Sequence, residues 1–288
     1  RDPLWSRGLG DVYKRQSVGV AYSRMNYELS RDFEVLEAHG QASIGSVFIT
    51  QPLIRSRTFD LSAQLQYEDK RLRDDIDLFE DSSQKHVELW SLSLNGNSQD
   101  SLLGGGQNFF YLTYGSGRLS IDDPMDQWRD HFTAGTNGGF QKLNLNAARL
   151  QYLSPRFQLY GQFNGQWSST NLDSSEKFGI GGPFDVRAYP QGSGSGDQGW
   201  QASLELRFLL APRWQLKAFV DHGAVQVNKS PWIHDENRRQ LSGAGVGASW
   251  SGPSQQISVT SAWALDNNQE GSGPERTPRI WASATQYF

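Results

Sequence analysis

The chain lacks cysteine, and it also lacks any run of about 18 apolar residues that could form a transmembrane helix. Without cysteine it holds neither disulfides nor thiolate-bound metals, which suits a protein that crosses an oxidising periplasm unfolded. The formal net charge of −4 offers no broad basic face for nucleic acid. Helical periodicity is nearly absent as well, so the sequence indicates a protein built from β-strands.

Apolar and polar residues alternate with a period of two through most of the chain. Over 59–68 the odd positions are apolar or aromatic and the even ones polar, and 157–167 and 200–208 show the same pattern. A strand that crosses a membrane needs about 9–11 residues, whereas globular strands average about 5–6. Strand length therefore favours a transmembrane β-barrel over a soluble β-sandwich, which the composition alone leaves open.

The predicted strands are joined by connections that are short and long in turn. Short turns follow residues 50, 95, 153, 210 and 250, and longer polar loops lie between them, including 69–84, 119–139 and 170–199. Bacterial outer-membrane barrels have short periplasmic turns and longer extracellular loops. The fold class is therefore predicted as all-β, a transmembrane antiparallel up-and-down barrel. We expect twelve strands, at 17–28, 39–51, 57–68, 85–95, 106–118, 140–153, 157–169, 200–210, 214–227, 239–250, 255–266 and 278–288.

Three local features complete this prediction. Residues 1–16 have no periodicity and resemble translated adapter sequence, with a disordered terminus as the alternative. The alternation breaks phase at Leu89-Trp90 and Ala147-Ala148, where we expect β-bulges. The chain ends on Phe288, an aromatic residue of the kind that barrel-assembly machinery reads as a C-terminal signal.

Three short motifs carry a resemblance to a known family. Val186-Arg187-Ala188-Tyr189 follows a glycine-rich stretch and resembles a Val-Arg-Gly-Tyr/Phe loop, and Phe219-Val220-Asp221-His222-Gly223 resembles a Phe-x-Asp-x-Gly strand. Leu53-Ile54-Arg55-Ser56-Arg57 is similar to a turn of the secretion branch. By their order and spacing along the chain, the three motifs resemble those of the two-partner secretion transporters, the haemolysin secretion/activation proteins of Gram-negative outer membranes. Ala188 departs from the family pattern by replacing a glycine.

The resemblance implies a barrel of sixteen strands, with the motif loop between the eleventh and twelfth. Seven predicted strands precede the loop and five follow it, so 17–288 is expected to be the C-terminal part of such a barrel, without its periplasmic POTRA domains. The implied function is a monomeric pore that passes an unfolded exoprotein from the periplasm to the cell surface. Its implied partners are that exoprotein, outer-membrane lipids with lipopolysaccharide, and the barrel-assembly machinery. The alternatives are an assembly factor of the same superfamily and the barrel anchor of a surface enzyme.

The resemblance also implies that loop 170–199 folds into the lumen and docks Arg187 on Asp221. Glu205, which faces the lumen, is a second candidate partner. The remaining motif residues are Gly181, Gly182, Val186 and Tyr189 of the loop and Phe219 and Gly223 of the strand.

A catalytic or cofactor role is not expected. The glycines of the loop lack the strand-then-helix context of a phosphate-binding loop. The Asp-His pairs, such as Asp221-His222, have no further ligand at metal spacing, and no Gly-x-Ser-x-Gly nucleophile motif is present. The chain is therefore predicted to be neither an enzyme nor a metal- or cofactor-binding protein.

Overall fold

One antiparallel sheet of twelve strands dominates the computed structural model, which describes residues 16–28, 38–76, 81–265 and 277–287. Each strand pairs with its neighbour in sequence, apart from the short insertion between β7 and β10. The strands are β1 (Ser17–Glu28), β2 (Ala38–Arg55), β3 (Phe59–Ile76), β4 (Asp81–Asp100), β5 (Gly106–Ile121), β6 (Gly138–Tyr152), β7 (Phe157–Ser168), β10 (Gln198–Ala211), β11 (Trp214–Gln226), β12 (Arg238–Ser251), β13 (Gln255–Ala264) and β14 (Arg279–Gln286).

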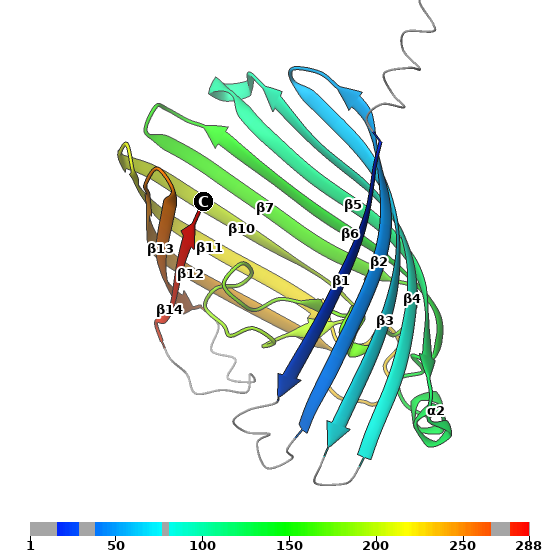
Figure 1. Ribbon diagram of the computed structural model, residues 1–288. Coiled ribbons are helices and arrows are strands. Elements are labelled where there is room, and N and C mark those ends of the chain that lie inside the picture. Colours follow the sequence, from blue (N-terminus) through cyan, green and yellow to red (C-terminus); the bar gives the residue numbers. More distant parts are fainter. Residues whose placement is uncertain (1–15, 29–37, 77–80, 266–276, 288) are drawn as a thin grey trace, which may run out of the picture.

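The sheet curves strongly, as Figure 1 shows, and its concave face holds the segment between β7 and β10. β1 pairs only with β2 and β14 only with β13 within the described residues, so the sheet is not closed. The predicted all-β class and the twelve strands in meander order are confirmed. No helix in the described ranges is long and apolar enough to cross a membrane.

Several strands extend further than the alternation predicted. The expected loop 69–84 is largely a continuation of β3 and β4, which stay paired as far as Ile76 and Asp81. The expected loop 119–139 contains a helix, α2 (Pro124–His131), whose N-cap is Asp123. The strand extensions were missed because their outward face is polar and their inward face mixes charged residues with Leu72, so the period of two disappears while the backbone pairing continues.

The predicted bulges at Leu89-Trp90 and Ala147-Ala148 are wrong, since the register runs unbroken through both sites. Leu89 faces inward and is buried, whereas Trp90 faces outward. The break in alternation at Leu89-Trp90 therefore arises because apolar side chains also lie on the concave face, and not because the strand contains an extra residue. Those side chains form a buried cluster of Val87, Leu89, Leu119, Ile121 and Phe140 around Leu172, which comes from the segment after β7. Register shifts occur instead at Pro52/Ile54 and Leu209/Ala211.

The outward face of the sheet carries an apolar band that ends sharply. On β3 the outward positions from Phe59 to Tyr67 are apolar or aromatic, and those that follow are Asp69, Arg71 and Arg73. Leu65 lies in the band with 44% of its surface exposed. An exposed apolar band bounded by aromatic and charged residues is the outer surface of a barrel in a bilayer.

The two faces can be distinguished by an arginine scan of neighbouring positions. Leu65→Arg, on the outward face, should destabilise the protein in lipid vesicles by about 2 kcal/mol or more, because it places a cation in hydrocarbon. Gln64→Arg, on the concave face, should change stability far less. The measurement is the urea midpoint of the complete protein in vesicles. Equal losses for both variants would contradict this assignment of faces.

Candidate functional site

The segment between β7 and β10, called here the inner loop (169–197), runs along the concave face. It contains a short helical turn, η4 (Ser174–Glu176), and a small hairpin of β8 (Phe178–Gly179) and β9 (Ser195–Gly196). Ile180 N–H donates to the Gly194 carbonyl at 2.9 Å and continues the hairpin. Ile180 and Val186 are fully buried against Val225 of β11 and Leu241 of β12. The inner loop is therefore packed against the wall of the sheet.

Arg187, at the tip of the inner loop, binds Asp221 of β11 through two parallel hydrogen bonds. Nε donates to Asp221 Oδ2 at 2.9 Å and Nη2 to Oδ1 at 2.7 Å, and the backbone N–H of Arg187 adds a third contact to Oδ2 at 3.1 Å. Both side chains are buried. A bidentate guanidinium–carboxylate pair is short, directional and stronger than a neutral hydrogen bond. The structure thus brings together the two residues that the motifs singled out.

The remaining donors of Arg187 bind β10. Nη1 donates to Glu205 Oε1 at 2.5 Å and Nη2 to Ser203 Oγ at 2.9 Å. The guanidinium also lies 3.4 Å from the centre of the Phe219 ring, within the range of a cation–π contact. Together with Asp221 these groups form the Arg187 cluster, in which a buried cation has partners on every side.

Glu205 differs from Asp221 in having other cations close by. Its second oxygen lies 2.6 Å from Nη2 of Arg207, and Lys217 Nζ is 3.8 Å from its first oxygen. In contrast, every hydrogen bond that the Asp221 carboxylate accepts within the described residues comes from Arg187. Loss of the Arg187 side chain would therefore leave the Asp221 carboxylate with only the backbone N–H of residue 187, whereas Glu205 would keep the guanidinium of Arg207.

Glycines in the inner loop and on β11 allow the loop to fold tightly and to lie close to the strand. A Cβ at Gly181 would lie 2.4 Å from the Pro190 carbonyl oxygen, and one at Gly223 would lie 3.2 Å from Cβ of Ile180. Gly182 has φ +138°, a conformation that strongly favours glycine. Ala188, the departure from the family pattern, fits because it faces Gly243 of β12, where a Cβ would lie only 2.7 Å from that of Ala188.

The other motif residues pack around the tip. Val186 belongs to the buried cluster with Ile180, and Tyr189 packs partly against it. Phe219 is buried with Ala188 and Ala262. Trp281 of β14 donates its indole N–H to the Arg187 carbonyl at 2.8 Å. Phe288, the predicted assembly signal, lies outside the described residues.

A second ionic contact of the inner loop was not found from the sequence. Glu176 accepts hydrogen bonds from Lys70 of β3 at 2.8 Å and Lys142 of β6 at 2.6 Å, and Asp173 accepts one from Lys85 of β4 at 2.9 Å. We call these five residues the lysine anchor. The sequence signal that was available is a lysine at an inward position on each of three strands.

The charges of the lysine anchor are coupled. Burial alone would oppose ionisation of Glu176, but the ammonium groups of Lys142 and Lys70 outweigh it and lower the pKa of this carboxyl. Burial likewise opposes ionisation of Asp173, and Lys85 with the Ser175 donors lowers its pKa. Both carboxylates therefore stay charged at neutral pH despite their burial.

Asp197 joins the two ends of the inner loop. It is completely buried, and its oxygens accept from the N–H groups of Leu172 at 3.1 Å and Lys229 at 2.7 Å. The Lys177 ammonium lies 3.2 Å from the same carboxylate. This aspartate follows Gly196 in the sequence, and it fixes where the inner loop leaves and re-enters the sheet.

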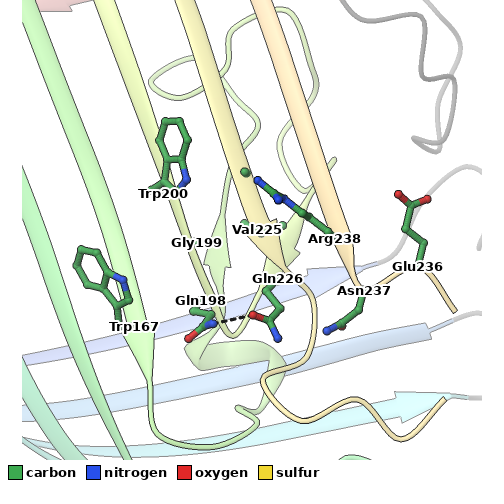
Figure 2. A pocket seen from close by; sticks show the side chains of 10 residues that line it. Trp167, Gln198, Gly199, Trp200, Val225, Gln226, Glu236, Asn237 and Arg238 are labelled. Carbon is green, nitrogen blue, oxygen red and sulfur yellow. Dashed lines mark hydrogen bonds between the residues drawn. The ribbon is translucent and has the colours of Figure 1, made fainter. Parts of the chain in front are cut away.

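The described part of the chain contains no arrangement suited to catalysis or metal binding. Within the described ranges no three His, Asp or Glu side chains gather as metal ligands. A pocket of about 420 Å³ opens at the ends of β7, β10, β11 and β12 (Figure 2), where Gln198 donates to Gln226 at 2.7 Å. Its walls include Trp167, Trp200 and Arg238, with no nucleophile paired to a base.

A family model described as "Haemolysin secretion/activation protein ShlB/FhaC/HecB" matches residues 13–250. The chain belongs to this family. The Heme/hemopexin transporter protein HuxB of Haemophilus influenzae is 24% identical over 281 residues, which cover 94% of this chain and 48% of that protein. The chain spans about half the length of the curated relatives it matches.

Solved structures of the same fold agree with the meander. CdiB from Escherichia coli superposes with a TM-score of 0.72 at 18% identity, over 93% of this chain and 49% of that one. CdiB from Acinetobacter baumannii superposes with a TM-score of 0.67 at 15% identity, over 94% of this chain and 48% of that one. As a member of the haemolysin secretion/activation family the chain is an outer-membrane barrel protein of two-partner secretion, and it is not an enzyme.

Acid should loosen the lysine anchor. The pKa values of Glu176 and Asp173 are lowered in the docked loop from 4.5 and 3.8, so ionisation favours docking above those values. The stabilisation is then lost as the pH falls through the lowered values. Hydrogen exchange of residues 172–177, corrected for intrinsic rates, should rise below about pH 4. Glu176→Gln should raise the exchange rate of these residues already at neutral pH. Exchange rates of the wild type that do not change with pH after this correction would contradict the prediction.

Proposed function

We propose that this protein is the translocation pore of a two-partner secretion system. It passes an unfolded exoprotein from the periplasm to the cell surface through the space that the inner loop occupies. Membership of the haemolysin secretion/activation family supports a secreted substrate. The family match also favours secretion over the two alternatives, barrel assembly and anchoring of a surface enzyme.

The observation that carries the proposal is the docking of Arg187 across to β10 and β11. A polypeptide can use the lumen only if the inner loop gives way, so the contacts of the loop tip set the resistance to passage. A single charge-assisted hydrogen bond is worth about 1.5–3 kcal/mol. Removing one member of a buried ion pair costs about 3–5 kcal/mol. The Arg187 cluster is therefore strong enough to hold the loop at rest and weak enough to be released by a binding substrate.

The proposed partners follow from this role. The exoprotein enters extended, and its folding outside the cell makes passage favourable without a nucleotide. Barrel-assembly machinery inserts the protein, lipids and lipopolysaccharide surround it, and it works as a monomer. The apolar band on the outward face supports the lipid contact.

Arg187→Ala should release the tip of the inner loop and lower secretion several-fold, while the barrel still assembles. The physical reason is the buried Asp221 carboxylate, which loses both guanidinium donors and keeps only the backbone N–H of residue 187. Exoprotein release and heat-modifiable mobility should be measured together in the complete secretion system. Secretion by Arg187→Lys should fall between that of the wild type and that of Arg187→Ala, because an ammonium keeps the charge but cannot make the bidentate contact.

Two further variants sharpen this experiment. Arg187→Ala combined with Asp221→Asn should recover part of the barrel's thermal stability, since the unpaired charge is then removed. Arg213→Ala, at an exposed turn between β10 and β11, serves as the matched control. Normal secretion by Arg187→Ala, with the loop shown to be undocked, would refute the proposed role of this contact.

An engineered disulfide tests whether the inner loop must move. The 288 residues of the chain contain no cysteine, so cysteines at positions 180 and 223 would be the only pair among them. A Cβ built at Gly223 would lie 3.2 Å from Cβ of Ile180, close to the roughly 3.5–4.5 Å of a disulfide. Oxidation should stop secretion and a reductant should restore it.

The matched control joins two wall strands through the same position. Cysteines at 201 and 223 have Cβ atoms 3.2 Å apart but link β10 to β11 and leave the inner loop free. The ratio of secretion in the reduced and oxidised forms should be high for the 180/223 pair and near one for the 201/223 pair. A ratio near one for both, with oxidation complete, would show that the loop does not need to leave the wall.

A further inference from the structure

We propose that the outward surface of β1–β5, just beyond the apolar band, binds the phosphate-bearing headgroup of an outer-leaflet glycolipid. The inference depends on the placement of this barrel in the outer membrane. It does not depend on the proposed secretion role of the inner loop.

Strand register gathers arginines on this surface. Arg24 of β1, Ser43 of β2, Arg71 of β3 and His86 of β4 share one row of cross-strand neighbours. In the row nearer the band, Arg118 of β5 lies across from Glu88. Arg73 occupies the next row outward. All four arginines are exposed, on the face opposite to the inward lysines of the lysine anchor.

The surface is hollowed beside Arg71 and Arg73. A groove of about 700 Å³ is lined by residues of β1 to β4, among them Tyr22, Ser43, Gly45, Arg71, Arg73 and His86. Its floor is open because β2 contributes small residues, and a Cβ built at Gly45 would meet no atom within 4 Å. The groove therefore has room for a sugar phosphate beside the guanidinium groups.

The position matches the headgroup level of a membrane. Tyr67 and Trp90 pair at the edge of the apolar band, with ring centroids 5.0 Å apart, as interfacial aromatic residues do. Arg71 follows Tyr67 by four residues, which is about 13 Å along the strand. In the next row below the aromatic pair, exposed Ile49, Leu65 and Leu92 offer apolar surface for acyl chains. One lipid molecule can therefore contact apolar strands with its chains and the arginines with its headgroup.

The acidic residues of this surface are engaged locally. Asp69 lies 2.7 Å from His86 Nε2 and 3.4 Å from Arg71 Nε, and Glu88 accepts the Tyr67 hydroxyl at 3.0 Å. Asp122 also lines the groove. The arginines outnumber these carboxylates, and a planar guanidinium binds phosphate in a bidentate manner better than an ammonium does. The chemistry favours a phosphorylated ligand over a neutral one.

The test uses the complete protein purified in detergent and binding of bis-phosphorylated lipid A, measured by native mass spectrometry. The variant Arg71→Gln/Arg118→Gln should bind lipid A at least tenfold more weakly than the wild type. The control Arg156→Gln/Arg213→Gln removes the same charge from exposed turns at the opposite end of the strands and should bind normally. Heat-modifiable mobility reports that each variant is folded, and single Arg71→Gln, at an arginine that lines the groove, replaces the double variant if the double variant does not fold.

Two comparisons identify the ligand. Dephosphorylated lipid A should bind the wild type weakly, and millimolar inorganic phosphate should not displace lipid A. Equal weakening in both double variants, or equal binding of the dephosphorylated lipid, would overturn the proposal. Displacement by inorganic phosphate would show a free-anion site instead of a lipid site. Because no exoprotein is present, failure here is separate from failure of the secretion proposal.

Discussion

A buried guanidinium must have anionic partners, and this requirement organises the concave face. Arg187 can be inside the barrel only because Asp221 and Glu205 project inward from neighbouring strands, two residues apart in register. Asp221 in turn needs the Arg187 guanidinium, since its buried charge would be costly without it, whereas Glu205 also has Arg207 beside it. The tip of the inner loop, the inward face of β10 and β11, and the glycines that let them meet are therefore parts of one electrostatic arrangement.

The inner loop is held near its start and at its tip by different chemistry. Its tip docks by one arginine between two carboxylates, whereas its first residues dock by two carboxylates among three lysines. Leu172 fills an apolar cluster between β4, β5 and β6 beside the lysine anchor. A segment fixed at one end can swing about that end when the other is released. The two contacts thus give the loop a defined direction of motion.

Local patterns predicted the strands and the motif residues, and distance in the sequence explains most of what was missed. Alternation of residues identified all twelve strands, because each strand turns an apolar face outward and a more polar face inward, but it failed where both faces are polar or both are apolar, as at Leu89-Trp90. The family motifs pointed to Arg187 and Asp221. The partners of Glu176 could not be read from spacing, since Lys70 lies 106 positions away and its side chain alone carries no sign of that contact. The Asp173 pair and the arginine-lined groove likewise depend on strand register, which only the three-dimensional structure supplies.

The hydrogen bond from Trp281 to the Arg187 carbonyl has a consequence for the order of assembly. It joins residues 94 positions apart, and the donor belongs to β14, the last strand of the sheet. The inner loop is synthesised before β11, β12 and β14, all of which supply atoms that hold its tip. Contacts between distant segments form only after the intervening chain has been ordered. Docking of the tip is therefore a late event of folding, and a chain whose inner loop is seated has already completed its C-terminal strands.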